Sequence, residues 1–146
     1  MKNIQFKAAT EEDRTFFIYV HHTAYRETVE KQFGWEEKVQ DEFANKAFDE
    51  EGIHLIIYKD QKIGVVGWET LPTHLLLKEL FILPEFQGNG IGTEILKHTK
   101  ERARELAKPI RLGTLRTNQR AKKLYEKHGF QVEEETDRHW KLVWGE

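Results

Sequence analysis

The residues best suited to chemistry lie between Leu80 and Gly92, where an apolar segment runs into a turn with glycine at positions 88, 90 and 92. Glycine lets the backbone come close to a ligand, and the N–H groups at the start of a following helix point toward it with the positive end of the helix dipole. A pyrophosphate suits such a turn. The sequence excludes a P-loop, because no lysine separates Gly92 from Thr93, and the glycine spacing does not match a dinucleotide fingerprint.

This turn, Gln87-Gly88-Asn89-Gly90-Ile91-Gly92, resembles the Gln/Arg-x-x-Gly-x-Gly element of the GNAT acetyltransferase superfamily. A second segment, residues 118–130, resembles the family's Asn-x-x-Ala-x-x-Leu-Tyr-x-x-x-Gly-Phe element. Two elements in the family's order identify the chain as a member. The motifs are confined to residues 80–130, and the first half is matched by its pattern of helices and strands only.

The resemblance implies acetyl-CoA as the acyl donor. Backbone N–H groups of the glycine turn would bind its pyrophosphate, with Thr93 adding a hydroxyl, while the backbone of the central strand would bind the pantetheine amides as an added strand does. One strand N–H would also face the thioester carbonyl. Asn118 has two roles open to it, a helix N-cap and a pantetheine contact. The expected cofactor-binding residues are Phe81, Ile82, Leu83, Gln87, Gly88, Asn89, Gly90, Ile91, Gly92, Thr93 and Asn118.

Tyr125 is the candidate general acid for acetyl transfer. A phenol with an ordinary pKa of about 10 can protonate a departing thiolate and stays protonated at neutral pH. Packing beside Leu124 is the alternative, and the surrounding motif favours catalysis. The candidate base is Glu79, which lies just ahead of the central-strand residues, although an ion pair with Lys78 is a competing explanation; Glu69 is the reserve.

Acceptor recognition in this family falls to the first two helices, their connection and the last two strands. Tyr25, Arg26 and Trp35 are the candidate substrate-binding residues, because large side chains of these types can stack and form hydrogen bonds. Arg26 has an alternative partner in Glu30, one turn on, and Trp35 could equally clamp the two helices together. Further candidates are Gln40, His139 and Trp140.

Metal and thiol chemistry are not expected. The chain contains no cysteine, which excludes disulfides and thiolate ligands. Neighbouring histidines on a helix, such as His21 and His22, point to different faces, and no carboxylates lie at ligand spacing in the sequence. We therefore predict no metal.

Composition limits the remaining partners. With 146 residues we expect one domain, residues 1–146, and a formal net charge of −2 without a basic face argues against nucleic acid. No apolar run approaches the roughly 20 residues that span a bilayer, so we expect no membrane partner and a cytoplasmic location. The expected acceptor is a small-molecule or peptide amine, and a homodimer is an admissible assembly.

The hydrophobic patterns predict an α+β fold in the order βααβββαβαββ, which is also the family's order. The sheet is expected to be GNAT-like, mixed and mostly antiparallel, with helices on both faces. The first helix is predicted to end near His22, with Tyr25–Gly34 as a connection. The second helix is predicted from residue 35 or 36 to about Phe48, with Val39, Phe43 and Ala47 at helical spacing. The central strand, 74–83, is predicted to be buried on both faces.

These observations predict an N-acetyltransferase that moves an acetyl group from acetyl-CoA to a primary amine by direct attack in a ternary complex. The alternative is a non-catalytic acyl-CoA-binding sensor or regulatory module, which would keep the glycine turn but lack effective acid and base groups. Tyr125 favours the enzyme. A domain that binds no cofactor is disfavoured, since three glycines before a helix cost stability without a ligand to explain them.

Overall fold

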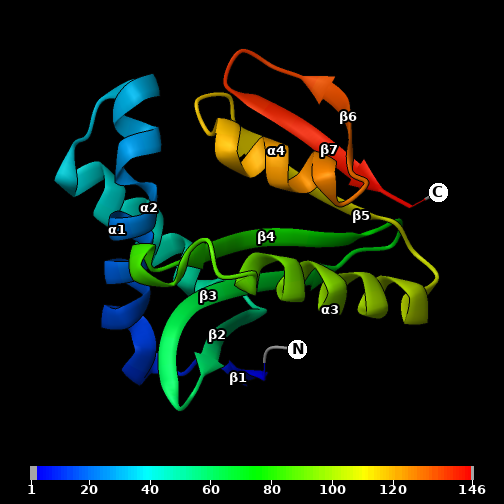
Figure 1. Ribbon diagram of the computed structural model, residues 1–146. Coiled ribbons are helices and arrows are strands. Elements are labelled where there is room, and N and C mark those ends of the chain that lie inside the picture. The colour runs from blue at the N-terminus through cyan, green and yellow to red at the C-terminus, as the bar shows by residue number, and fades with distance from the viewer. Residues whose placement is uncertain (1–2, 146) are drawn as a thin grey trace.

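A computed structural model describes residues 3–145 of the chain and shows one seven-stranded sheet, with the strand order β1-β2-β3-β4-β5-β7-β6 (Figure 1). Every neighbouring pair is antiparallel except β4 and β5. The predicted α+β fold, its order of elements and the central place of β4 are confirmed. The strands are β1 (Ile4–Ala8), β2 (Ile53–Tyr58), β3 (Gln61–Thr70), β4 (Leu75–Ile82), β5 (Ile110–Leu115), β6 (Gln131–Glu135) and β7 (His139–Trp144).

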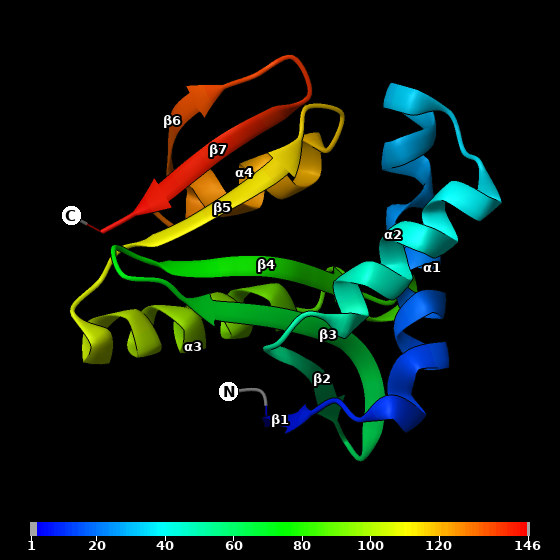
Figure 2. The ribbon, with the colours of Figure 1, turned by 180° about the vertical axis from the view of Figure 1, so that it is seen from behind.

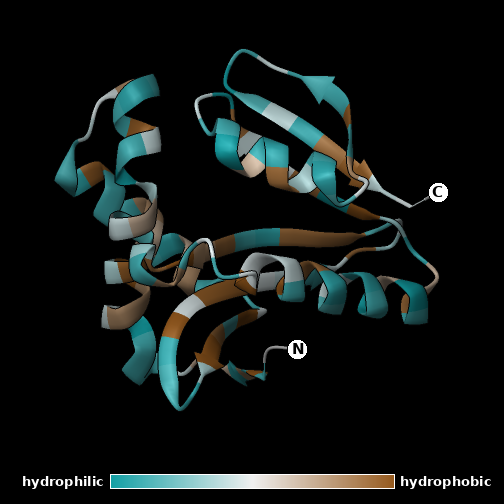
Figure 3. Ribbon diagram, in the orientation of Figure 1, coloured by the Kyte–Doolittle hydropathy of each residue, from teal (hydrophilic) through white to brown (hydrophobic). Residues whose placement is uncertain are grey.

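Helices cover both faces of the sheet, as Figures 1 and 2 show from opposite sides. Side chains alternate between the faces of a strand, so Val66 packs in the cluster that contains Ile95 of α3, while Val65 packs in the cluster that contains Phe17 of α1. The most hydrophobic residues accordingly lie along the strands (Figure 3). The helices are α1 (Arg14–Phe33), α2 (Glu37–Asp49), α3 (Ile91–Leu106) and α4 (Gln119–Lys127), with short 3-10 turns η1 (Glu11–Asp13) and η2 (Pro84–Phe86).

The central strands β4 and β5 pair over only two residues and then diverge. Leu75 pairs with Ile110 and Leu76 with Arg111, whereas the rest of β4 stays paired with β3 alone (Figure 1). The prediction that this strand is buried on both faces therefore holds only near its start, since its residues from Lys78 to Ile82 are partly exposed. The divergence opens one edge of β4 to a ligand.

The first helix is longer than predicted. α1 continues past His22 to Phe33, so the predicted connection over residues 25–34 is wrong, and only residues 34–36 join α1 to α2. Val29 is buried in the added turns, and Gly34 ends the helix with φ of 78° while its N–H donates to the Glu30 carbonyl oxygen. The polar residues after His22 hid the continuing helix because they lie on its exposed side.

The predicted apolar face of α2 is wrong at Val39 and Phe43, whereas Ala47 packs against the core. Val39 and Phe43 are 36% and 59% exposed, while Gln40 and Ala44 are the buried residues of this helix. Within residues 3–145 no helix has the length and hydrophobicity needed to cross a bilayer.

Candidate active site

The glycine turn presents a row of unpaired backbone N–H groups. Gly88 and Gly90 have φ of 78° and 79°, a backbone conformation that side chains other than glycine rarely adopt, and Gly90 is the N-cap of α3. The Glu94 N–H is the first to be bonded, to the Gly90 carbonyl oxygen. No acceptor within residues 3–145 takes the six N–H groups from Gly88 to Thr93. This arrangement fits a pyrophosphate.

Two side chains support the turn from either side. The Gln87 amide donates to the Ile82 carbonyl oxygen at 2.8 Å and accepts from Arg120 Nη1 at 3.0 Å. Arg120 Nη2 lies 3.9 Å from the position that a Cβ on Gly88 would occupy. Arg120 therefore brings a positive charge to the turn. Sequence reasoning missed it, because it lies 33 positions further along, at the start of α4.

The open edge of β4 lies just before this turn. The Leu83 N–H donates to the Ile63 carbonyl oxygen of β3 at 2.9 Å. Because successive residues of a strand point their polar backbone groups to opposite sides, the N–H and carbonyl of Ile82 face away from β3, and those of Phe81 and Leu83 face toward it. Of the three strand positions predicted to bind pantetheine, Ile82 alone faces the open edge, and its carbonyl already accepts from Gln87.

The predicted companions of the turn come from or contact α4. The Asn118 carboxamide oxygen caps this helix by accepting from the Ala121 N–H at 3.1 Å, so the N-cap role is present. The Thr93 hydroxyl lies 3.2 Å from His128 Nε2. Gly92 packs against α4, since a Cβ there would lie 3.3 Å from Leu124 Cδ2. The turn and α4 thus form one unit.

Glu79 has the most perturbed carboxyl among the described residues. It is partly buried, and no described residue forms a hydrogen bond or ion pair with it. Burial, followed by the nearby Glu50 carboxylate, raises the pKa of Glu79 to about 7, against a smaller lowering effect of Lys78. A carboxyl group with that pKa can accept a proton near neutral pH.

The local strand geometry sets Glu79 in place. The pairing of β3 with β4 shifts register between Gly67 and Trp68, which makes a bulge next to Glu79. Gly67 is its partner on β3, and a Cβ at Gly67 would lie 3.5 Å from the Glu79 Cβ and Cγ atoms. The glycine leaves room for the glutamate side chain.

Lys78, the proposed ion-pair partner of Glu79, interacts with other groups. Lys78 Nζ lies 3.6 Å from a Glu50 carboxylate oxygen and 3.7 Å from one of Glu69, and it donates to the Glu51 carbonyl oxygen. Lys78 therefore pairs with Glu69, the reserve base, and not with Glu79.

Tyr125 is buried against the same core cluster as α3. Its ring lies 5.7 Å from that of Phe130, centroid to centroid, and burial raises the pKa of its phenol to about 12. The hydroxyl forms no hydrogen bond with any described residue, yet no described side-chain polar atom is both fully buried and unpaired. The hydroxyl oxygen of Tyr125 therefore has some contact with solvent. The ring packs in the core, and the hydroxyl can still donate its proton to a ligand.

Two adjoining cavities lie between the first two helices and the strands. The first, of about 480 Å³, is named the Glu79 cavity. The second, of about 470 Å³, is named the Phe33 cavity and continues from it, because Tyr25, Gln40, Phe43 and His139 line both. The Glu79 cavity is also lined by His21, Ala47, Glu50, Leu76, Leu77, Lys78, Glu79, Phe81, Gly113 and Thr114, and the Phe33 cavity by Val29, Phe33, Gly34, Glu36, Val39, Leu115 and Arg138.

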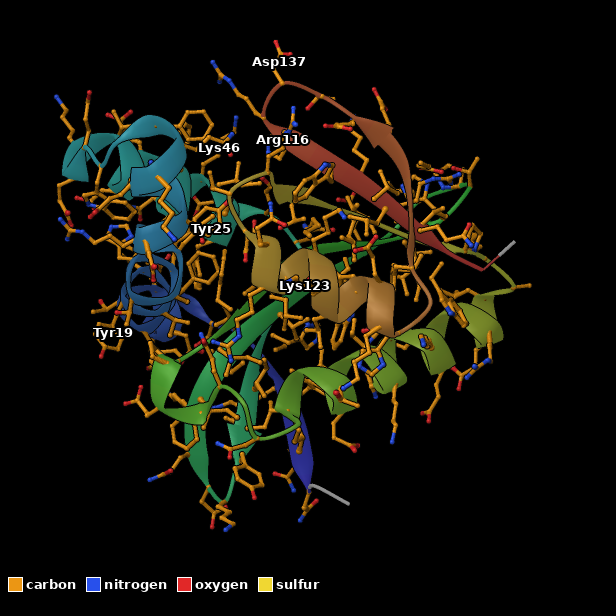
Figure 4. All side chains as sticks on the ribbon, turned by 45° about the horizontal axis from the view of Figure 1, so that its top comes forward. Tyr19, Tyr25, Lys46, Arg116, Lys123 and Asp137 are labelled. Atoms are coloured by element: carbon orange, nitrogen blue, oxygen red, sulfur yellow. The ribbon has the colours of Figure 1, made fainter. Side chains whose placement is uncertain are left out.

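The structure separates the three residues predicted to bind the acceptor. Tyr25 lies in the cavities, where burial and then the Glu79 charge raise its pKa to about 12, and Figure 4 shows it extending from α1 toward α4. Arg26 and Trp35 line neither cavity. Arg26 Nε donates to a Glu30 carboxylate oxygen at 2.6 Å, as in the alternative, and its guanidinium carbon lies 5.1 Å from the Trp35 ring centroid.

Sequence reasoning named Gln40 and His139 among the further candidates, and both line the cavities. It missed Phe43 and Val39 as lining residues because both were assigned to the core. The sequence pattern alone does not show that Val39 and Phe43 are exposed, because this depends on which side of α2 faces the sheet.

The sequence shows no carboxylates at ligand spacing from the paired histidines, but the fold brings two of them from α2 beside His22. His22 Nε2 lies 2.7 Å from Asp41 Oδ1 and 3.7 Å from Glu37 Oε1, and His22 Nδ1 lies 2.9 Å from His21 Nδ1. The His22, Glu37 and Asp41 ligand atoms lie within 4.8 Å of one another. Hydrogen bonding of His22 to Asp41 and His21 explains this cluster, and the absence of a metal stays a prediction.

A sheet that opens beside its central strand, with a glycine turn at the end of that strand, defines the class of the protein as an acyltransferase fold of the GNAT type. The family model described as the acetyltransferase (GNAT) family matches residues 11–130. The chain belongs to this family. It is also 26% identical over 131 residues to an uncharacterized N-acetyltransferase of Archaeoglobus fulgidus, covering 84% of this chain and 89% of that protein.

Solved structures share the fold at low sequence identity. The PaiA N-acetyltransferase of Thermoplasma acidophilum, solved in complex with coenzyme A, superimposes with a TM-score of 0.82 at 18% identity, covering 99% of each chain. An acetyltransferase of Thermus thermophilus gives a TM-score of 0.75 at 16% identity, covering 98% of each chain. These likenesses confirm the fold.

Proposed function

We propose that the protein transfers an acetyl group from acetyl-CoA to a primary amine by direct attack within a ternary complex. The observation that carries this proposal is Glu79, a partly buried carboxyl group with a pKa raised to about 7 and no described partner, in a cavity beside the open edge of the central strand. Family membership and the coenzyme A bound to the Thermoplasma neighbour support the choice of donor.

Different parts of the site bind different parts of acetyl-CoA. The N–H groups from Gly88 to Thr93 hold the pyrophosphate, and Arg120 adds a positive charge that the sequence motif alone does not supply. The open edge of β4 at Ile82 receives the pantetheine arm. The acetyl group then lies at the point where β4 leaves β5, next to Glu79.

Proton movements balance across the reaction. The acceptor ammonium first loses one proton to solvent, which makes the nitrogen lone pair available for the thioester carbon. Glu79 takes the second proton from that nitrogen as it attacks, directly or through water, and then releases it to solvent. The carbon–nitrogen bond forms and the carbon–sulfur bond breaks. Tyr125 gives one proton to the departing sulfur and regains it from solvent. Its raised pKa keeps the phenol protonated throughout the neutral range.

Calorimetric titration with acetyl-CoA, followed by thiol release with a panel of primary amines, tests the proposal. We expect binding, and thiol release that depends on an amine and yields an acetylated amine by mass spectrometry. Binding without release on any amine would favour the sensor alternative over the enzyme. No binding of acetyl-CoA would contradict the assignment of the glycine turn.

A further inference from the structure

The Phe33 cavity has an unusual lining for a surface groove. Its walls carry Phe33, Val39 and Phe43, which are 49%, 36% and 59% exposed and are three of the most exposed large apolar side chains described. Val29 and Leu115 complete the apolar wall. Exposed apolar side chains that converge on one hollow typically mark a binding site.

The walls of this cavity are tied together across the opening of the sheet. Gln32 Nε2 of α1 donates to the Arg138 carbonyl oxygen at 2.9 Å. The Thr28 carbonyl oxygen of α1 accepts from the Thr117 hydroxyl at 2.7 Å. The Arg138 guanidinium carbon lies 5.1 Å from the Phe33 ring centroid. The apolar cavity is thus formed before any ligand enters, and binding there needs little rearrangement.

Charge in the two cavities is arranged unequally. The Glu79 cavity holds the carboxylates of Glu50 and Glu79 with Lys78 beside them, which suits a single ammonium group. Among the described residues that line the Phe33 cavity, the charged side chains are one acid, Glu36, and one base, Arg138. A second ammonium would find no net negative charge there.

We infer that the acceptor is a primary amine on an apolar chain or ring, whose nitrogen lies at Glu79 and whose body fills the Phe33 cavity. This inference rests on the proposed function and names its acceptor class. Continuity of the two cavities through Tyr25 and Phe43 lets one molecule occupy both. Polycationic amines and amino sugars lack the apolar surface that this wall would cover.

A series of unbranched amines tests the inference, because ethylamine, butylamine, hexylamine and octylamine have nearly the same basicity and differ in chain length. Calorimetric titrations with coenzyme A present should show affinity rising about threefold per added methylene up to hexylamine, close to the value for burying a methylene group. Spermidine, similar in length to octylamine but with three nitrogens, should bind at least tenfold more weakly than octylamine. Affinity independent of chain length, or tighter binding of spermidine, would overturn the inference.

Paired variants test the location. Phe33→Ser should lower the ratio of octylamine to ethylamine affinity at least threefold. Tyr19→Ser is the matched control, since Tyr19 is an aromatic residue of the same helix that is 54% exposed and lies outside both cavities, on the side of α1 turned away from α4 (Figure 4). It should leave the ratio unchanged. Equal effects of the two variants would contradict the assigned cavity.

The same experiments separate this inference from the proposed function. A gain in binding with chain length but no acetyl transfer to any amine would contradict the enzyme and support the cavity assignment. Acetyl transfer to ethylamine or spermidine without a gain with chain length would support the enzyme and contradict the acceptor class.

Discussion

Burial and a neighbouring negative charge act on the Glu79 carboxyl in the same direction, and both keep its proton at a pH where most carboxyl groups have lost theirs. Tyr125 shows the complementary case, in which burial raises the pKa of a phenol that is already neutral. The pKa of Glu79 therefore lies near neutral pH, and that of Tyr125 lies well above it. One can accept a proton there and the other can give one, which is what amine acetylation needs.

At this scale, Tyr125→Phe should leave acetyl-CoA affinity within about twofold of the wild type and lower kcat by about 10²-fold. The phenyl ring keeps the packing against Phe130 and removes only the hydroxyl, which has no described hydrogen-bond partner. Steady-state kinetics with one acceptor measures kcat, and calorimetry measures affinity. An unchanged kcat would mean that the leaving sulfur takes its proton from elsewhere.

At the scale of elements, the site depends on how β4 ends and how α3 begins. β4 ends at Ile82 beside a strand that has already diverged, and α3 begins at Ile91 with no acceptor for its first N–H groups among the described residues. η2 and the glycine turn join them over a short stretch of chain. The strand edge and the helix start thus face one ligand because the chain between them is short.

The glycine turn yields a prediction with a matched control. Gly90→Glu should abolish detectable acetyl-CoA binding, because it adds a side chain and a negative charge to the turn. Gly34→Glu imposes the same substitution at nearly the same φ, 78° against 79°, away from the turn, and a Cβ there meets open space. It should retain donor binding by calorimetry. Equal binding by both variants would refute the phosphate site.

Much of this element scale could be predicted from the sequence, because glycine, proline and apolar alternation act locally. The order of the elements, the central strand over residues 74–83 and the Asn118 cap agree with the structure. The end of α1 and the exposed face of α2 could not, since both depend on what packs against them. Arg120 escaped notice for the same reason: its contact with Gln87 exists only when α4 is placed beside the turn.

At the scale of the whole molecule, the sheet consists of two parts joined centrally by two residue pairs between β4 and β5. The part with β1 to β4 supplies Glu79, and the part with β5 to β7 supplies His139, while Tyr125 lies on the helix that precedes β6. The ties from Gln32 and Thr117 join the two parts again across the cavity. The site lies where the parts diverge, so their relative position determines its width.

Glu79 should also carry a stability cost that depends on pH. Its pKa is raised from 4.5 to about 7 in the folded protein, so the folded state binds more protons than the unfolded state between these values, and this contribution to stability falls as pH rises. Glu79→Gln removes that dependence. Its stability relative to wild type should increase by about 2 kcal/mol from pH 5.5 to pH 8 in urea unfolding. A constant difference would contradict the raised pKa.

The measurement that tests the central claim most directly is the pH dependence of thiol release from acetyl-CoA, with hexylamine as acceptor, for the wild type and Glu79→Gln. Because Glu79 must be ionised to accept a proton, we predict that wild-type kcat rises with pH to a plateau with an apparent pKa near 7, and that Glu79→Gln loses this limb and at least tenfold in kcat. A limb of the same position and height in both proteins would contradict the account, because another group would then be the base.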